Sequence, residues 1–229
     1  MKNLYLAVNF FAVIVPFVFS FHPKIRFYKH WKAFFIADGI VTLIFIMWDN
    51  LFTNLGVWGF NPDYITGIYI FSLPLEEVLF FICIPYACTF TYHALTSFYN
   101  FQWDKKKENL FVLLFAIFIL TIGLIYYNRL YTSVTFISTA ILLLIIQFLL
   151  KVDGLSKIFT SYAILLIPFF IVNGILTGTG IDKPVVWYNP AENLGIRLLT
   201  IPIEDVIYGL ELIILVILGY EYLKKGQKN

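Results

Sequence analysis

Two short segments of this sequence place adjacent acidic residues inside apolar stretches. Pro-x-Glu-Glu occupies 74–77 and Pro-x-Glu-Asp occupies 202–205. A charged side chain inside a bilayer costs roughly 3 to more than 10 kcal/mol, so such acids must face a polar partner, each other or a substrate. Desolvation favours the neutral form of a carboxylic acid, and two neighbouring carboxyls can then act as proton donor and proton acceptor. The candidate catalytic residues are therefore Glu76, Glu77, Glu204 and Asp205.

A structural interpretation of these acids stays open beside the chemical one. If Pro74 and Pro202 each begin a helical segment, Glu76 and Glu204 come at its third position, where Glu favours capping of the helix N-terminus. Capping requires one acid, whereas each segment has two. The spacing leaves donor and acceptor unassigned, with Glu76 or Glu204 favoured as donor and Glu77 or Asp205 as the tuning group or base.

Helical spacing predicts which side chains accompany the acids. In a helix over 67–96, Tyr69, Ser72, Glu76 and Cys83 share one face, and in a helix over 197–222, Glu204, Tyr208 and Glu211 share one face. Aromatic rings near the acids could stabilise a carbocation, although most aromatic residues at helical spacing serve packing.

Further polar residues lie in neighbouring apolar runs and could reach the same cavity. Their alternative role is interhelical hydrogen bonding, worth about 1 kcal/mol each. The candidate substrate-binding residues are Trp48, Asp49, Asn50, Trp58, Phe80, Phe81, Asn173 and Tyr208. Neither the two cysteines nor any glycine-rich segment predicts a metal or a cofactor, and we expect none.

The composition places these residues in a membrane. Hydrophobic residues make up 60% of the 229 and charged residues 13%, against about 25% charged in soluble domains. A net charge of +2 gives no indication of a nucleic-acid partner. Runs of roughly 20 apolar residues suit membrane helices. Seven such runs lie near 3–21, 33–50, 67–96, 109–127, 130–150, 158–177 and 197–222. They predict an all-α membrane protein with seven transmembrane helices.

Positive charges predict the orientation of these helices. Twelve of the 16 Lys and Arg residues fall in the loops 22–32, 98–108 and 151–157 and in the tail after 222. Loops rich in Lys and Arg stay in the cytoplasm. We therefore expect a multi-pass protein of the cell (inner) membrane with its N-terminus outside and its C-terminus in the cytoplasm.

The two acidic segments belong to an internal repeat. Residues 61–78 match 189–206 without a gap at an offset of 128 (204 − 76), and the match keeps both acids. The repeat predicts two parallel three-helix halves, 1–100 and 130–229, joined by a linker helix within 101–129. Repeats related by an axis along the membrane normal build sites at their interface.

Together these segments resemble the membrane-integral lycopene cyclases, small bacterial and archaeal carotenoid cyclases that are also fused to phytoene synthase in fungi. In some bacteria the two halves are separate subunits. The resemblance covers almost the whole chain. Its first half rests on Trp48–Asn50, Gly56–Trp58, Phe60–Pro62, Gly67–Ile68, Leu73–Glu77 and Leu79–Phe81. Its second half rests on Asn173, Leu176–Gly178, Gly195–Arg197, Ile201–Asp205 and Tyr208. Tyr208-Gly209 replaces Phe80-Phe81, so the halves are not chemically equivalent.

The resemblance implies a substrate and a reaction. Lycopene or another ψ-ended carotene would come from the bilayer, and acid-catalysed isomerisation of its ψ-ends to β-ionone rings would give γ- or β-carotene. Because both halves lie in one chain, we expect no partner subunit. The expected partners are the carotene and membrane lipid. Two alternatives remain open: a proton-coupled membrane transporter, and a non-catalytic carotenoid-binding subunit.

Overall fold

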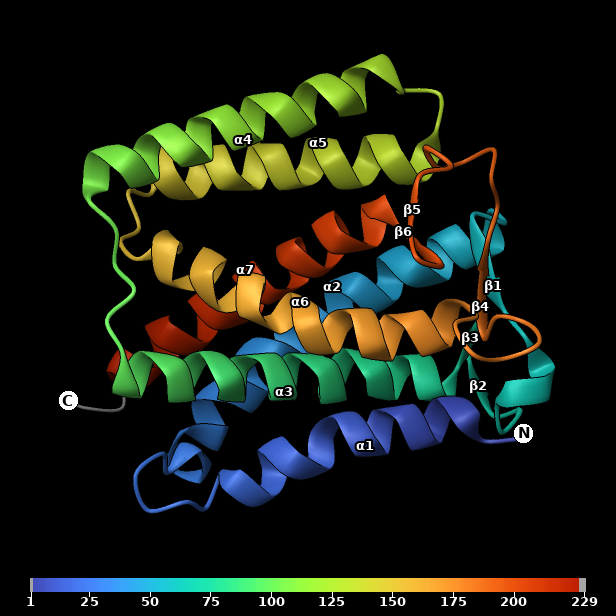
Figure 1. The fold of residues 1–229 in the computed structure, drawn as a ribbon, viewed down its shortest axis with the longest axis horizontal. Coiled ribbons are helices and arrows are strands. Elements are labelled where there is room, and N and C mark those ends of the chain that lie inside the picture. The colour runs from blue at the N-terminus through green and yellow to red at the C-terminus, as the bar shows by residue number, and fades with distance from the viewer. Residues whose placement is uncertain (1, 227–229) are drawn as a thin grey trace.

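The computed structural model describes residues 2–226, and α-helices make up most of this part of the chain (Figure 1). The helices are α1 Leu4–Phe19, α2 Trp31–Asn54, α3 Leu75–Phe98, α4 Lys105–Ile125, α5 Leu130–Leu144, α6 Leu155–Thr177 and α7 Ile203–Gly226. Short helical turns occur at Phe27–His30 and Pro62–Tyr64, and a π-helical turn, Ile145–Leu149, continues α5. Glycines at positive φ bound α6, Gly154 at 92° and Gly178 at 116°, where residues with a side chain are rarely found.

The apolar helices confirm an all-helical membrane fold. Within residues 2–226, six helical stretches are long and apolar enough to cross a membrane; they begin at Phe27, Leu75, Lys105, Leu130, Leu155 and Ile203. The remaining apolar helix, α1, has 16 residues. At 1.5 Å per residue it extends about 24 Å, less than the ~30 Å of a hydrocarbon core. A seventh crossing through α1 therefore stays a prediction.

Two helices begin later than the sequence predicted. Residues 67–74 and 197–202 form tight hairpins instead of the first turns of membrane helices. Strand β2 Tyr69–Ile70 pairs with β3 Leu73–Pro74, and β5 Arg197–Leu198 pairs with β6 Ile201–Pro202, all antiparallel. The turns pass through Phe71 and Leu199, whose φ values of 57° and 59° are left-handed and incompatible with a continuing helix.

The prolines explain why each helix starts where it does. Pro74 has φ −64° and ψ 150°, an extended conformation, and α3 starts at the next residue. The acids then fall in the first turn, with Glu76 second and Glu77 third. The predicted shared face of Tyr69, Ser72, Glu76 and Cys83 is wrong, because the first two belong to the loop and hairpin. In contrast, α4 starts at Lys105, earlier than predicted, because the Asp104 carboxylate accepts the N–H groups of Lys106 and Lys107.

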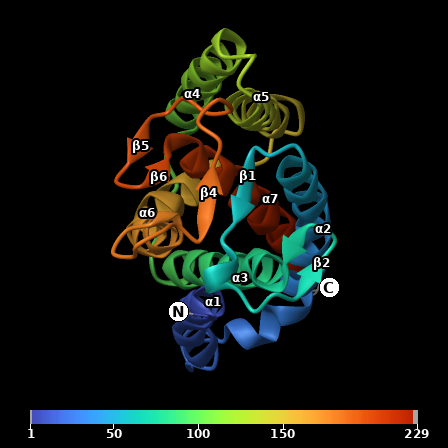
Figure 2. The same cartoon turned by 90° about the vertical axis from the view of Figure 1, so that its right-hand side faces the viewer.

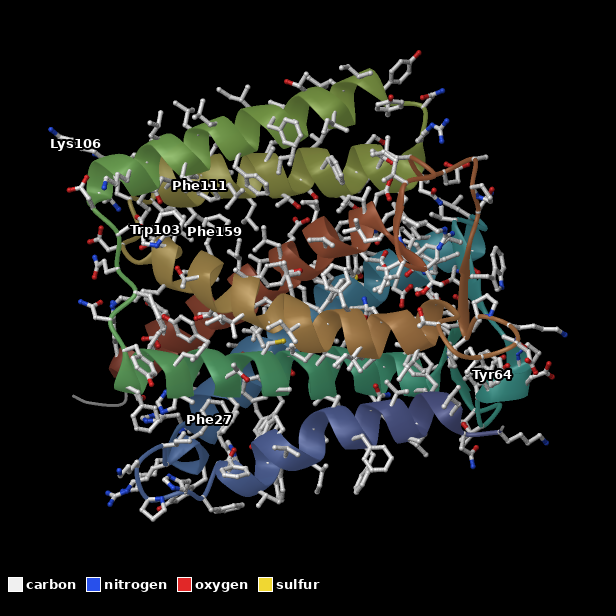
Figure 3. All side chains as sticks on the ribbon, viewed as in Figure 1. Phe27, Tyr64, Trp103, Lys106, Phe111 and Phe159 are labelled. Atoms are coloured by element: carbon white, nitrogen blue, oxygen red, sulfur yellow. The ribbon has the colours of Figure 1, made fainter. Side chains whose placement is uncertain are left out.

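The helices form a bundle with α3 packed between α1 and α6 (Figures 1 and 2). Helices α2 and α7 pack together behind them, and α5 joins α7 to α4. Helix α4 lies at the edge of the bundle, where Phe111 packs against Trp103 and Phe159 with ring centroids 5.2 Å apart in both pairs (Figure 3).

A two-stranded ribbon joins the two halves of the sequence. Strand β1 Trp58–Phe60 pairs antiparallel with β4 Val186–Tyr188, with Trp58 opposite Tyr188. Backbone bonds extend the ribbon, from the Asn61 N–H to the Val185 carbonyl and from the Asn189 N–H to the Val57 carbonyl, both 2.8 Å. Figure 2 shows the ribbon at the end of the bundle where the hairpins lie.

Helices α2 and α7 approach closely at Gly219. A Cβ placed on Gly219 would lie 3.0 Å from the Ala37 Cβ, closer than an ordinary contact. We expect Gly219→Leu to lower the free energy of unfolding by about 1–3 kcal/mol, because the extra side chain forces the helices apart. Thermal denaturation in detergent measures this. Gly39→Leu is the control, since a Cβ there has nothing within 4 Å. Equal losses in both variants would contradict the prediction.

Candidate active site

A mostly apolar cavity of about 590 Å³ lies between α1, α3, α6 and α7. Among the described residues that line it, three have carboxyl groups: Asp49, Glu77 and Asp205. One belongs to α2, one to α3 and one to α7, so the two halves of the sequence contribute acids to the same space. Protein cavities of 300–1,000 Å³ with a few convergent polar groups commonly bind small molecules.

In the first acidic pair, the two side chains have different surroundings. Glu77 lines the cavity, and the Tyr5 hydroxyl of α1 donates to its Oε2 at 2.5 Å. Glu76 is fully buried outside the cavity lining, and its Oε1 accepts the backbone N–H of Thr66 at 2.6 Å. The Asn9 amide donates to the Glu76 carbonyl oxygen at 2.7 Å. Glu76 therefore holds the loop before α3 against the helix.

The second acidic pair repeats this arrangement. Asp205 lines the cavity and accepts two hydroxyls, Tyr131 on Oδ1 at 2.6 Å and Tyr188 on Oδ2 at 2.9 Å. Glu204 is fully buried outside the lining, and its Oε1 accepts the Leu194 N–H at 2.7 Å and the Thr132 hydroxyl at 2.6 Å. Burial and the nearby Asp205 raise the pKa of the Tyr188 hydroxyl well above its usual range, which keeps it a donor.

Helix geometry explains the difference within each pair. Adjacent residues on a helix point about 100° apart, so one acid faces the cavity while its neighbour faces the preceding loop. The Glu76 and Glu204 carboxylates bind backbone N–H groups ten residues earlier in the chain, at Thr66 and Leu194, rather than the first turn of their own helices. The capping interpretation is therefore wrong in detail, although both residues do have a structural role.

The four motif acids, together with Asp49 and Glu211, accept their observed hydrogen bonds from their own half of the sequence. In the first half, Glu77 accepts a hydrogen bond from the Tyr5 hydroxyl and Glu76 accepts one from the Thr66 N–H. Asp49 accepts one from the Trp58 indole N–H. In the second half, Asp205 accepts hydrogen bonds from the hydroxyls of Tyr131 and Tyr188. Glu204 accepts from the Thr132 hydroxyl and the Leu194 N–H. Glu211 accepts from the hydroxyls of Ser138 and Thr139, both at 2.8 Å. The halves meet instead through aromatic rings and the β1–β4 ribbon.

Aromatic rings form the wall beside the carboxyls. The Trp58 ring centroid lies 5.0 Å from that of Tyr131 and 6.2 Å from that of Tyr208, and Tyr131 stacks on Tyr188 at 5.9 Å. Trp58, Tyr131, Tyr188 and Tyr208 all line the cavity. The Asp49 carboxylate fixes the Trp58 indole in this cluster through its Oδ1.

The cavity includes most of the residues singled out from the sequence. It is lined by Asp49, Trp58, Glu77, Phe80, Phe81, Asn173, Asp205 and Tyr208. The other four are Trp48, Asn50, Glu76 and Glu204, which are outside the lining. Asn50 binds the first hairpin, accepting the Ser72 hydroxyl on Oδ1 at 2.6 Å, and Trp48 packs its ring 5.1 Å from that of Tyr208.

The predicted shared face on α7 is only partly correct. Glu204 and Glu211 both accept hydroxyls from α5, as residues seven apart on one face should. Tyr208 instead lines the cavity with Asp205, three residues before it. The face of α7 that borders the cavity therefore includes Asp205 and Tyr208.

Sequence reasoning missed the tyrosines that bind the cavity carboxyls. Tyr5 and Tyr131 lie near the starts of α1 and α5, the first helices of the two halves, and each donates to the second acid of its own half. If the internal alignment is extended to these two helices with a shift of two residues, it matches Tyr5 with Tyr131. This match could have indicated their shared role. Tyr188 sits opposite Trp58 in a ribbon that the sequence did not predict. Within residues 2–226, no group of three or more His, Cys, Asp or Glu is placed to hold a metal ion.

These features define a membrane-embedded helical bundle in which two similar segments surround an apolar cavity with buried carboxyls. Comparison with known families agrees. The sequence profile of the lycopene cyclase family matches residues 2–95 and 128–223, so the chain belongs to the lycopene cyclase family. The two matched regions include all four acids of the paired motifs.

A curated relative supports this assignment over a short segment. The chain is 33% identical over 58 residues to a bifunctional lycopene cyclase/phytoene synthase of Aspergillus niger. The match covers 25% of this chain and 10% of that protein, so the chain spans only a small part of the relative's length. No solved structure matches the chain.

Proposed function

We propose that this protein is a lycopene cyclase that closes the ψ-ends of a linear carotene into β-ionone rings without net oxidation or reduction. A proton adds to C2 of the terminal double bond and leaves a cation at C1. The C5–C6 double bond attacks C1, and the new C1–C6 bond closes a six-membered ring with the cation at C5. Loss of the C6 proton forms the ring double bond, so one proton enters and one leaves.

The observation that carries this proposal is that Glu77 and Asp205 reach one apolar cavity from opposite halves of the chain. The reaction needs an acid and a base together in a space that excludes water, because a carbocation in contact with water is captured by it. A cavity lined mostly by apolar side chains and two separately held carboxyls meets both requirements.

Hydrogen bonding distinguishes the two carboxyls. Asp205 accepts a tyrosine hydroxyl on each oxygen, which stabilises its charged form, and each oxygen keeps a second lone pair for a proton. Glu77 accepts one hydroxyl, from Tyr5 on Oε2. We therefore assign Glu77 as the proton donor and Asp205 as the acceptor, with Tyr5, Tyr131 and Tyr188 as positioning residues.

The aromatic wall suits the cationic intermediate. Ring faces attract positive charge by about 0.5–2 kcal/mol each, and more where water is excluded. Trp58, Tyr131 and Tyr208 lie together beside the carboxyls. In this proposal Asp49 acts through Trp58, by holding its indole N–H so that the ring keeps its place in the wall.

We also propose that all seven helices cross the cell membrane, with α4 linking two parallel halves, 1–100 and 130–229. The hairpins and the start of α1 lie at one end of the bundle, while Lys106 and the end of α7 lie at the other (Figures 1 and 3). The basic loops thus gather at one end, which supports a cytoplasmic assignment for that end. The acids then sit near the outer face, and the carotene comes from the surrounding lipid.

Pigment analysis of bacterial cells that make lycopene tests the proposed function. Cells that express this chain should convert lycopene to γ- or β-carotene, and cells with an empty vector should not. Unchanged lycopene beside correctly inserted protein, shown by a tag on purified membranes, would reject the cyclase proposal for this substrate. A protein that copurifies with unchanged lycopene would instead be a carotenoid-binding subunit.

A further inference from the structure

The cavity is longer than the reaction centre alone requires. Along α3 its lining runs from Glu77 to Thr91. At 1.5 Å per residue these 14 steps extend roughly 20 Å along the helix. The carboxyls and the aromatic wall occupy one end, and the rest is lined by apolar side chains such as Ile84, Leu165 and Leu212. The shape is therefore a groove with its reactive groups at one end.

The groove opens to the side of the bundle between α1 and α6. Phe11 of α1 is 71% exposed and Ile171 of α6 is 62% exposed, yet both line the cavity. Both belong to apolar helices, so these exposed side chains face the lipid when the bundle is in a membrane. Figure 2 shows α1 and α6 on the same side of the bundle, with α3 beside them.

The corresponding position in the second half is closed. Helix α2 packs directly on α7 there, where Ala37 meets Gly219. At the offset of 128 that relates α3 to α7, Gly219 corresponds to Thr91, which lines the groove. Glycine lets α7 pack closely on α2, whereas the equivalent position of α3 has a side chain that lines the groove. The two halves are similar in sequence, but α2 packs closely on α7, whereas α3 and α6 line the groove.

We infer that this groove is a side entrance through which a linear carotene passes from the bilayer to the carboxyls. This inference rests on the proposed function. The polyene lies along α3 with one ψ-end against Glu77 and Asp205, and its remainder stays among apolar side chains or in the lipid. Because the acids occur at one end of the groove only, the two ends of one carotene are cyclised in separate visits. The monocyclic product leaves before the second ring forms.

Tryptophan substitutions at the opening test the entrance. Ala12→Trp on α1 and Ile171→Trp on α6 each place a large ring at a lining position from opposite walls. The matched controls are Val15→Trp and Ile167→Trp, which lie on the same helices at exposed positions outside the lining. We expect at least a tenfold lower initial rate of lycopene conversion in both opening variants, and less than a twofold change in both controls, at equal amounts of membrane-inserted protein.

The results separate the entrance from the proposed function. If the wild-type chain makes no cyclic product, the cyclase proposal fails and the entrance fails with it. If the wild type is active and both opening variants match their controls, the entrance alone is rejected. A time course with excess lycopene adds a second readout: free γ-carotene should appear before any bicyclic product. Bicyclic product formed from the outset, with no free monocyclic carotene, would reject separate visits.

Discussion

Glu77→Gln should abolish ring formation. Glutamine has nearly the same shape and still accepts the Tyr5 hydroxyl through its amide oxygen, but it has no acidic proton to give to the carotene. General acid catalysis contributes typically about 10²–10⁴-fold, so we expect conversion to fall by at least about 100-fold. The measurement is the rate of cyclic carotene formation per unit of membrane-inserted protein, in cells or in reconstituted membranes.

The neighbouring acid provides a matched control for this prediction. In Glu76→Gln, the amide oxygen can still accept the Thr66 N–H, and the residue lies outside the cavity lining. We expect this variant to keep cyclase activity within about tenfold of the wild type, since it changes a structural hydrogen bond worth about 1–3 kcal/mol at most. The reverse order, with Glu76→Gln inactive and Glu77→Gln active, would show that the donor is assigned to the wrong acid.

Asp205→Asn should produce the second large loss, together with a change in product. The asparagine oxygen can still accept one tyrosine hydroxyl, but the amide cannot take the C6 proton. We expect a loss of about 10²–10⁴-fold in β-ring formation. The C5 cation that does form can lose a proton from C4 or from its methyl group instead, so ε- or γ-rings should make up a larger fraction of the remaining product.

Chromatography and NMR of the extracted pigments distinguish these rings. Glu204→Gln is the matched control, because its amide oxygen can still accept the Leu194 N–H and the Thr132 hydroxyl outside the cavity. It should form β-rings at a rate within about tenfold of the wild type. An Asp205→Asn protein that makes β-rings at the wild-type rate would exclude Asp205 as the acceptor. A uniform loss without a change of ring type would indicate a supporting role.

The sequence predicted the apolar helices and the acidic segments well, for clear physical reasons. Long apolar runs have few alternatives to a membrane helix, because the bilayer requires every backbone polar group to be paired. Adjacent acids in such runs had to meet something polar. What spacing could not give was the rotation of each helix about its axis. That rotation is set by packing against α1 and α5, and it decides that Glu77 and Asp205, rather than Glu76 and Glu204, face the cavity.

The hairpins and the ribbon were not predictable in the same way. Residues 67–74 and 197–202 are apolar enough to continue a membrane helix, and only backbone conformation and proline position exclude it. The pairing of Trp58 with Tyr188 joins residues 130 positions apart (188 − 58), for which the local pattern has no signal. Tyr5 and Tyr131 lie 72 and 74 positions from the acids that they hold, so the local pattern does not reveal these aromatic residues as polar partners.

The pairing of the motif acids, and of Asp49 and Glu211, within their own halves bears on how the protein is made. The ribosome releases residues 1–100 into the membrane before residues 130–229 exist. Because Tyr5, Thr66 and Trp58 lie in this first segment, Glu77, Glu76 and Asp49 have hydrogen-bond donors before the second segment is made. The later segment likewise carries donors for its own acids. Assembly then joins the segments through ring surfaces, the ribbon and the packing of α2 on α7, and it leaves the hydrogen bonds of these acids unchanged. This architecture permits the two segments to be encoded by separate genes.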